Sequence, residues 1–524
     1  MRSPDRGPST VTAAPLAVIL AAGKGTRLQK NGHSAISKPL VCLRGLSLAE
    51  RSIAQLLAAG VERFVVVLGC EARRARAEFE RIARRRRCQI AFVVAEDWHK
   101  GNGCSAAAAA QLIGDDPFLL TMVDHLLSPE MIRQVLADPP GAHEITLATD
   151  RDTDNVLDVS DLTKVETSNG RVTSIGKNLP TWSAADTGLF YCSSTLFDGL
   201  SRAREQGRFS LTDGVRECIA EDRVRTIDVT GECWLDVDTP EAFREALQRI
   251  DAGMAKDGKD GFVSQYLNRP LSRRLSVAFA STPITPNHMT ALSFLMAMLG
   301  AAGLATTIPW LWIAAGVLIQ IASILDGCDG EIARIKLLQS QRGAWLDTVL
   351  DRYSDLAIGL AVTFAASQLD GAAWIWPAGF TATASFLMGS YVTKEFQIRF
   401  GHAYPTNLID KLKRRDLRIF VIAVGAVLGH PLIALLAIGS LTHLAVLQIL
   451  VSGWHTRRVT PRPATLPPNL GRASVDRPMD IVMGTERGDT IDSPAALSST
   501  GGGPVALSTE PLQRSTIRVS GKQR

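Results

Sequence analysis

The sequence predicts an α/β domain with a mostly parallel, Rossmann-like sheet, followed by an all-α transmembrane domain of six helices. In the first half, to about Arg274, charged segments alternate with short apolar runs rich in β-branched residues. From about His288 to Val451 long apolar runs dominate, and beyond Arg457 the chain is polar and rich in Pro, Ser, Thr and Gly. A length of 524 residues suits two or three domains.

The α/β prediction depends on five apolar runs that recur with helical patterns between them, as at Ser47–Ala59. Such alternation is typical of a parallel sheet covered by helices on both faces. Asn169-Gly170 then stands between two strand-like runs within Thr163–Ile175, which predicts an antiparallel hairpin. The five predicted strands are Leu16–Leu20, Phe64–Leu68, Ile90–Val94, Phe118–Val123 and Ile145–Ala148.

The membrane prediction depends on six apolar spans, each long enough or nearly long enough to cross a bilayer. Lys and Arg are missing from the connections after the first, third and fifth spans and frequent in the others, which predicts a multi-pass protein of the cell membrane with both termini in the cytosol. The net charge of +5 is small and does not indicate nucleic acid. The spans are Met289–Thr306, Trp310–Leu325, Ala344–Ser367, Ala372–Thr393, Leu417–His430 and Leu432–Trp454.

Composition shifts give the domain boundaries. We expect a disordered N-terminus at 1–13, the α/β domain at 14–250, a polar linker at 251–261 and the membrane domain at 281–455. The basic amphipathic segment 262–280 predicts a helix on the membrane surface. Residues 456–524 have too few apolar side chains for a core and are expected to be disordered.

Four carboxylates follow the second span: Asp326, Asp329, Asp347 and Asp351. Their spacings of three and four residues place each pair on one helix face. Carboxylates in apolar helices are costly and usually functional, and a converging group needs cations such as Mg²⁺ or Mn²⁺. Two such ions can bind a diphosphate and stabilise its charge as it leaves, and one carboxylate could accept a proton from an attacking hydroxyl. A position in a surface loop would explain Asp326 and Asp329 but not the other pair.

This run resembles the signature of CDP-alcohol phosphotransferases, D-x-x-D-G-x-x-A-R-x8-G-x3-D-x3-D, at every fixed position. The resemblance implies that Asp326, Asp329 and Asp347 bind two metal ions and that Asp351 completes the site and acts as base. It also implies that the small residues leave room for CDP, although helix packing is an alternative for them. The remaining fixed positions are Gly330, Ala333, Arg334 and Gly343.

Two basic residues, Lys394 and Arg399, follow the fourth span. They could hold an anionic acceptor, or they could only anchor the helix end at the membrane. Arg352 is a further candidate for the same role.

A glycine-containing loop follows the first predicted strand in the run AVILAAGKGTRL. Gly23 and Gly25 let backbone amides approach phosphates, and Lys24 and Arg27 supply charge. With Lys38-Pro39 further on, the loop resembles that of sugar-phosphate nucleotidyltransferases, which implies catalytic roles for Arg27 and Lys38.

That resemblance implies further site residues. Asp124 and Asp236 would bind one Mg²⁺, with Asp238 or an N-cap role as the rival at the second position and a strand-end cap as the rival for Asp124. Lys177 would contact the substrate phosphate, unless it is a surface lysine. The base pocket would be lined by Gly101, Asn102 and Gly103.

The combination of domains resembles a bifunctional family that joins an inositol-1-phosphate cytidylyltransferase to a di-myo-inositol-phosphate phosphate synthase. The resemblance is carried by MVDHL, DGFVSQYLNRPLSR and TPITPNHMT. It implies that CTP and inositol 1-phosphate give CDP-inositol, and that CDP-inositol and a second inositol 1-phosphate then give di-myo-inositol phosphate phosphate and CMP. The resemblance to CDP-alcohol phosphotransferases implies a homodimer through the membrane domain. The alternatives are action on another polyol phosphate, synthesis of a phospholipid from a CDP-alcohol, and an inactive membrane scaffold.

Overall fold

A computed structural model describes residues 14–28, 37–152, 162–254, 261–404, 411 and 413–455. The predicted disordered ends, 1–13 and 456–524, and most of the predicted linker lie outside these residues.

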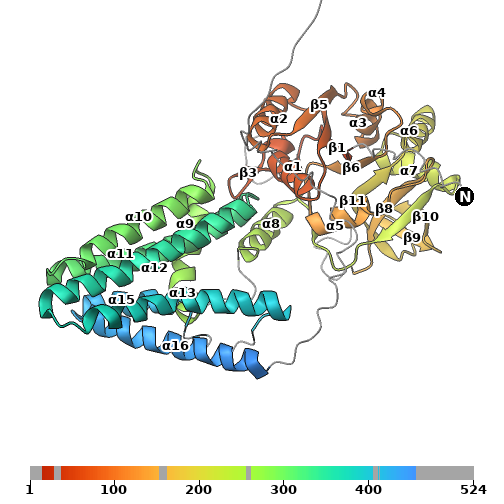
Figure 1. The fold of residues 1–524 in the computed structure, drawn as a ribbon. Helices are drawn as coiled ribbons and strands as arrows, with labels where there is room; N and C mark the ends of the chain where they lie inside the picture. Colours follow the sequence, from red (N-terminus) through yellow and green to blue (C-terminus); the bar gives the residue numbers. More distant parts are fainter. Residues whose placement is uncertain are drawn as a thin grey trace, which may run out of the picture. The chain divides into compact units, whose positions relative to one another are not determined.

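The α/β domain is built on a nine-stranded sheet with the order β5-β4-β1-β6-β11-β8-β12-β10-β9 (Figure 1). All five predicted strands are present, and the predicted hairpin is β9–β10, with Asn169 and Gly170 at positive φ. The strands are β1 Leu16–Ala21, β4 Arg63–Leu68, β5 Gln89–Val94, β6 Phe118–Met122, β8 Ile145–Asp150, β9 Lys164–Ser168, β10 Arg171–Gly176, β11 Ala184–Cys192 and β12 Val224–Asp228.

The sheet is mixed, so the prediction of a mostly parallel sheet is correct only for its first half. Strands β5, β4, β1 and β6 are parallel to one another. Strand β11 then runs antiparallel between β6 and β8, and β10 is antiparallel to both β12 and β9. The sequence does not indicate the change of direction at β11, because an apolar run such as this strand fits a parallel or an antiparallel neighbour equally well.

Helices cover both faces of the sheet because its strands are apolar on both sides. In β1, Leu16, Val18 and Leu20 enter one core, and the alternate residues Ala17, Ile19 and Ala21 enter the other. Helices α3, α6 and α7 pack on the first face, and α1, α2 and α5 on the second. The helices are α1 Leu48–Ala58, α2 Ala72–Arg86, α3 Asn102–Ala108, α4 Ala110–Ile113, α5 Pro129–Leu136, α6 Thr195–Glu205, α7 Leu211–Ala220 and α8 Pro240–Ala252.

Five short elements lie outside the main sheet, and three of them carry residues that line the cavity of this domain, namely Lys38, His125 and Trp234–Asp236. A 3₁₀ turn, η2 (Lys38–Leu40), precedes the ribbon of β2 (Cys42–Leu43) and β3 (Leu46–Ser47). Strand β7 (His125–Leu127) follows β6 directly and pairs antiparallel with β13 (Trp234–Asp236). In that register His125 lies opposite Asp236.

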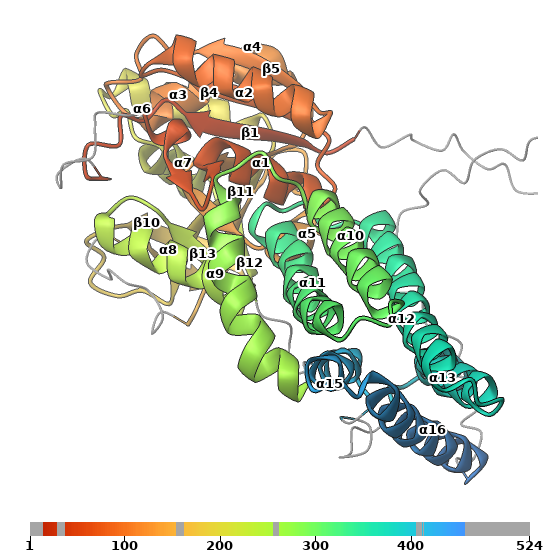
Figure 2. The same ribbon diagram turned by 90° about the vertical axis from the view of Figure 1, so that its left-hand side faces the viewer.

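The second domain is helical, and each of the six predicted spans coincides for most of its length with a helix of the described residues (Figure 2). The predicted spans Met289–Thr306 and Leu417–His430 extend past the ends of their helices, and Ala372–Thr393 begins before its helix. Buried residues from all six helices, such as Leu304, Ile319, Val362, Phe386 and Ile422, form their common core. The helices are α10 Pro286–Leu304, α11 Pro309–Ile335, α12 Gln341–Asp370, α13 Ile375–Phe400, α15 Arg415–Val427 and α16 Pro431–His455.

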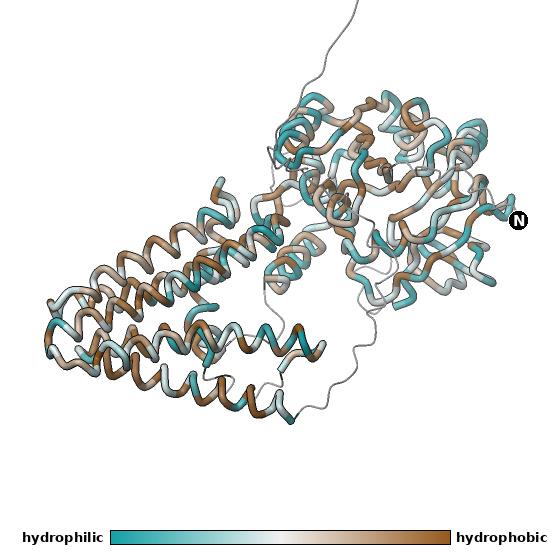
Figure 3. Tube along the Cα trace, viewed as in Figure 1, coloured by the Kyte–Doolittle hydropathy of each residue, from teal (hydrophilic) through white to brown (hydrophobic). Residues whose placement is uncertain are grey.

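Three of these helices, α10, α11 and α16, are long and apolar enough to cross a membrane within the described part of the chain. Figure 3 shows long hydrophobic stretches along the helices of this domain. Large apolar side chains such as Trp310, Phe380 and Leu447 are exposed on the outside of the helices, as a lipid environment requires. The count of six spans is not established, since α15 has only 13 residues, about 20 Å at 1.5 Å per residue.

The amphipathic segment before α10 forms a π-helical turn, η3 (Ser264–Asn268), that continues into α9 (Arg269–Ala280). One face of this segment, Asn268, Ser272, Ser276 and Ala280, is buried at intervals of four residues. It packs on α11, so the basic face is the one left exposed.

Candidate functional sites

A cavity of about 800 Å³ opens at the carboxyl ends of the central strands of the α/β domain. Among the residues predicted for this domain's site, seven line the cavity. Lys24, Gly25, Gly101 and Gly103 are not among the lining residues. Those that line it are Gly23, Arg27, Lys38, Asn102, Asp124, Lys177 and Asp236.

The β7–β13 ribbon brings the two predicted metal ligands together. Asp124 occupies the turn between β6 and β7, and its backbone carbonyl accepts a hydrogen bond from Val237, 3.0 Å away and directly after β13. Ligand atoms of Asp124, His125 and Asp236 all lie within 4.8 Å of one another. Asp236 Oδ1 is buried and has no hydrogen-bond partner within the part of the chain that the structure describes. The donor set therefore fits a divalent cation.

Basic side chains lie directly against these carboxylates. The Lys38 ammonium contacts both Asp124 Oδ2 and Asp238 Oδ1, and Arg27 Nη1 lies 3.1 Å from Asp238 Oδ2. Burial lowers the pKa of Lys38, but the charges of Asp124, Asp238 and Asp236 outweigh it and raise that pKa above its usual value. Lys38 and Arg27 therefore remain cationic and suit the phosphates of a nucleotide.

The pKa values of the two metal-ligand candidates are shifted in opposite directions. Burial raises the pKa of Asp124, but the charges of Lys38 and His125 hold it below its ordinary value. Burial and the neighbouring charge of Asp124 raise the pKa of Asp236 to about 6. A cation between them would relieve this repulsion.

The predicted base-pocket residues have different positions. A Cβ atom on Gly101 or Gly103 would lie 2.4 or 2.6 Å from the backbone carbonyl of Phe209, so both glycines permit close packing of the chain on itself. Asn102 lines the cavity and accepts a 2.8 Å hydrogen bond from the backbone of Leu211. Lys177 lines the cavity as an exposed residue, and Gly25 lies against the side chain of Lys38.

Sequence reasoning missed several acidic or imidazole side chains in this cavity, among them His125, Asp150 and Asp186. His125 Nδ1 lies 3.0 Å from Asp124 Oδ1, and Asp150 accepts a 2.8 Å hydrogen bond from the Trp234 indole. His125 directly follows Asp124 in the sequence, which was the available signal. For Asp150 and Asp186 we find no signal apart from their places on β8 and β11.

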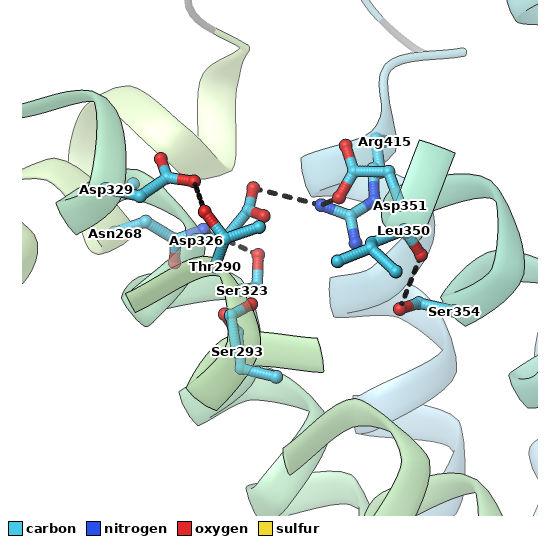
Figure 4. A network of polar contacts seen from close by, with 12 residues as sticks. Asn268, Thr290, Ser293, Ser323, Asp326, Asp329, Leu350, Asp351, Ser354 and Arg415 are labelled. Carbon is cyan, nitrogen blue, oxygen red and sulfur yellow. Dashed lines mark hydrogen bonds and ion pairs between the residues drawn. The ribbon is translucent and has the colours of Figure 1, made fainter. Parts of the chain in front are cut away.

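In the helical domain, the end of α11 faces the beginning of α12. Carboxylate oxygens of Asp326, Asp347 and Asp351 lie within 4.8 Å of one another, so the structure brings three of the four predicted ligands together. The fourth, Asp329, is not one of this trio, and its Oδ2 accepts a 2.7 Å hydrogen bond from Thr290 of α10 (Figure 4). This set of carboxylates fits a divalent cation because it offers only oxygen ligands.

The remaining signature residues lie in the same two helices. Gly343 donates its backbone N–H to Ser340, the N-cap of α12, at 3.0 Å, and a Cβ there would approach that hydroxyl equally closely. A Cβ on Gly330 would lie 3.4 Å from the Arg334 guanidinium. Arg334 donates to the Met254 carbonyl at 3.1 Å, and Ala333 is half-buried.

A second cavity, of about 220 Å³, adjoins these carboxylates. Asp326 and Asp351 line it, and three arginines line it with them: Arg269, Arg352 and Arg415. Of the three, only Arg352 was a candidate from the sequence. Lys394 and Arg399 do not line this cavity. Both side chains are exposed, and Arg399 pairs with Glu395.

A buried polar seam joins α9 to α11 beside this cavity. Glu331 is fully buried and accepts hydrogen bonds from Ser272 at 2.8 Å, Ser276 at 2.8 Å and Arg269 at 3.0 Å. Four residues before Ser272, Asn268 donates a 3.0 Å hydrogen bond to Ser323 of α11. The four-residue spacing of Asn268, Ser272 and Ser276 was the signal in the sequence.

Comparisons with known proteins match both domains. A family model for the MobA-like NTP transferase domain matches residues 17–223, and one for CDP-alcohol phosphatidyltransferase matches residues 283–452. The chain is 36% identical over 441 residues to a bifunctional IPC transferase and DIPP synthase of Rubrobacter xylanophilus, which covers 83% of this chain and 96% of that relative. A protein of the same name from Aquifex aeolicus is 31% identical over 442 residues, or 84% of this chain and 98% of the relative.

Two further likenesses each concern one domain. The archaetidylinositol phosphate synthase of Pyrococcus horikoshii is 26% identical over 182 residues, or 35% of this chain and 89% of that protein. A solved structure of the inositol-1-phosphate CTP transferase from T. maritima aligns with a TM-score of 0.41 and 22% identity, over 47% of this chain and 99% of that chain.

Proposed function

Because the chain belongs to the family of proteins named bifunctional IPC transferase and DIPP synthase, we propose that it carries out two successive transfers. The α/β domain converts CTP and inositol 1-phosphate to CDP-inositol and diphosphate. The membrane domain then transfers phosphoinositol from CDP-inositol to a second inositol 1-phosphate, giving di-myo-inositol phosphate phosphate and CMP. The observation that supports this proposal best is the presence, in one chain, of two acidic clusters that fit divalent cations.

In the first step, a phosphate oxygen of inositol 1-phosphate attacks the α-phosphorus of CTP, and diphosphate leaves. Lys38 and Arg27 lie on one wall of the 800 Å³ cavity and bind the triphosphate through their charges. Asp124 and Asp236 hold Mg²⁺ or Mn²⁺, which neutralises phosphate charge when it is bound. Lys177, on the cavity lining, contacts the phosphate of the polyol. Gly23 and Asn102 also line this cavity, and we assign them to the nucleotide.

In the second step, an acceptor hydroxyl attacks the phosphorus that bears inositol, and the bond to CMP breaks. Asp351 takes the proton of that hydroxyl, since it belongs to the carboxylate cluster and also lines the 220 Å³ cavity. Asp326, Asp329 and Asp347 would hold the divalent cations, with Asp351 completing the site, and the bound cations would neutralise the diphosphate of the donor.

The acceptor carries a phosphate of its own, which needs a cationic site. We assign it to the cavity arginines Arg269, Arg352 and Arg415 rather than to Lys394 and Arg399, because the cavity adjoins the carboxylates. A guanidinium suits this role because it binds phosphate oxygens in pairs.

The chain is proposed to cross the membrane with all six helices of the second domain and to place both termini in the cytosol. α9 would then lie at the membrane surface with its exposed Arg273 and Arg274 toward anionic headgroups. Two copies would associate through the membrane domain.

The test uses the full-length protein in detergent with CTP, Mg²⁺ and a panel of inositol 1-phosphate, glycerol 3-phosphate and glucose 1-phosphate. Diphosphate release is expected to be fastest with inositol 1-phosphate, followed by CMP release. An Asp351→Asn variant should release diphosphate but no CMP. Preference for another phosphate would contradict the inositol assignment, and turnover with another nucleotide only would contradict the coupling between the domains.

A lipid substrate at the membrane site is the second candidate, favoured by the likeness of this half to an archaetidylinositol phosphate synthase. Vesicles containing CDP-diacylglycerol, supplied with inositol 1-phosphate, test it. CMP release from these vesicles that exceeds release from CDP-inositol would favour the lipid reaction.

A further inference from the structure

A guanidinium occupies part of the space that a cation in the membrane-domain site would need. Nη1 of Arg415 lies 3.0 Å from Asp326 Oδ2 and 2.9 Å from Asp351 Oδ1, so one nitrogen bridges α11 and α12 (Figure 4). Asp326 and Asp351 belong to the trio that fits a divalent cation. Arg415 and a metal ion therefore compete for the same carboxylates.

Arg415 is held in this position by a buried group outside the signature. Its Nε lies 3.2 Å from Asp355 Oδ1, and Asp355 is only 1% exposed. Arg418, 3% exposed, contacts the other oxygen of Asp355 at 3.2 Å and stacks on the Phe386 ring at 4.6 Å. Asp355 thus anchors the Nε side of Arg415 and leaves Nη1 for the carboxylate cluster.

The arrangement has a clear electrostatic reason. Three carboxylates within 4.8 Å of one another in a partly buried site repel strongly unless positive charge lies among them. Arg415 supplies that charge without a metal ion. Since Asp355 holds Nε, the guanidinium can leave Asp326 and Asp351 and still stay at the edge of the cavity.

We propose that Arg415 is a resident counter-ion of the membrane-domain site, which a divalent cation must displace from Asp326 and Asp351, and that Asp355 keeps it beside the site after displacement. This inference rests on the proposed metal site. When no substrate is present, Arg415 opposes metal binding. Once displaced, its guanidinium is available to an anion in the adjoining cavity. By linkage, an anion that holds Arg415 away from the carboxylates strengthens metal binding.

The test measures Mn²⁺ affinity by the loss of the free-ion electron paramagnetic resonance signal. It uses full-length protein in detergent, with Asp236→Asn in the background to remove the contribution of the α/β domain. Arg415→Gln is expected to bind Mn²⁺ about tenfold more tightly, because the competing charge pair is lost. Asp355→Asn, which only loosens Arg415, should give a smaller gain.

Controls separate this inference from general effects of charge and folding. Arg414→Gln removes the same charge from the neighbouring residue, which does not line the cavity, and should leave the affinity unchanged. Arg415→Lys keeps the charge and should stay within about twofold of the parent, since a single ammonium still competes. Mn²⁺ should also raise the melting temperature of Arg415→Gln more than that of the parent.

The outcomes distinguish two failures. If the parent binds Mn²⁺, Asp347→Asn abolishes that binding and Arg415→Gln binds no more tightly, the counter-ion role is wrong while the metal site stands. If neither the parent nor Arg415→Gln binds Mn²⁺ at the membrane site, the proposed metal site itself is wrong and the inference falls with it.

Discussion

The Thr290 hydroxyl donates a 2.7 Å hydrogen bond to Asp329 Oδ2 and thereby ties the start of α10 to the acidic end of α11. Thr290 is buried and lies outside the CDP-alcohol signature. The bond orients Asp329, the one signature carboxylate outside the trio whose oxygens lie within 4.8 Å of one another. The correct placement of Asp329 therefore depends on a helix that contributes no carboxylate to the cluster.

Replacement of this hydroxyl should slow the second transfer. Thr290→Val keeps the shape but removes the donor, and we expect CMP release from supplied CDP-inositol to fall about tenfold, since a hydrogen bond to a charged group contributes about 1.5–3 kcal/mol. Thr290→Ser keeps the donor and serves as the matched control. Equal rates for the two variants would show that the bond has no part in the reaction.

Loss of either acidic cluster should separate the two transfers. Asp236→Asn is expected to reduce diphosphate release from CTP by at least about 100-fold, because it removes one of the two carboxylates proposed to hold the cation. The same variant should still release CMP at the normal rate when CDP-inositol is supplied. Asp347→Asn should behave in the opposite way. A variant that loses both activities would indicate a folding defect, which circular dichroism would detect.

Several features of the sites were predictable because they depend on spacing along one element. Asp347 and Asp351 were correctly placed on one helix face by their spacing of four residues, and Asp355 continues that spacing, although it was overlooked. Arg415 could not be assigned, because its partners lie 89 and 64 positions earlier and its own segment is typical of basic residues at a membrane boundary. Gly101 and Gly103 were interpreted as residues that line the base pocket, but close contact with Phe209 accounts for them, and no local pattern indicates such a contact.

The seam between α9 and α11 should make a large contribution to stability. Arg269→Met leaves the fully buried Glu331 without its cationic partner, and loss of one partner of a buried pair costs about 3–5 kcal/mol. Arg273→Met, in the same helix but exposed, is the matched control and should change the free energy of unfolding by less than about 0.5 kcal/mol. Thermal unfolding in detergent measures both. Similar melting temperatures would show that the two hydroxyls of the seam compensate for the lost charge.

A pH-dependent effect on stability is expected from Asp186, which lies in the cavity of the α/β domain. Burial raises its pKa to about 6, although its Oδ1 accepts a 2.8 Å hydrogen bond from the Gly188 backbone. Between about pH 4 and pH 6 the folded state keeps a proton that the unfolded state has lost, so stability falls as the pH rises through this range. Above about pH 6 the whole penalty applies, and below about pH 4 there is none.

Asp186→Asn removes this charge and keeps an oxygen that can accept from Gly188. The variant should therefore be more stable than the parent, by about 2–3 kcal/mol at pH 8 and by about 1 kcal/mol less at pH 5. Asp222→Asn, whose side chain is 78% exposed, controls for the loss of an aspartate. Thermal unfolding of the full-length protein at the two pH values, in the presence of EDTA, measures the difference. A gain that is the same at both pH values would mean that packing, and not ionisation, causes it.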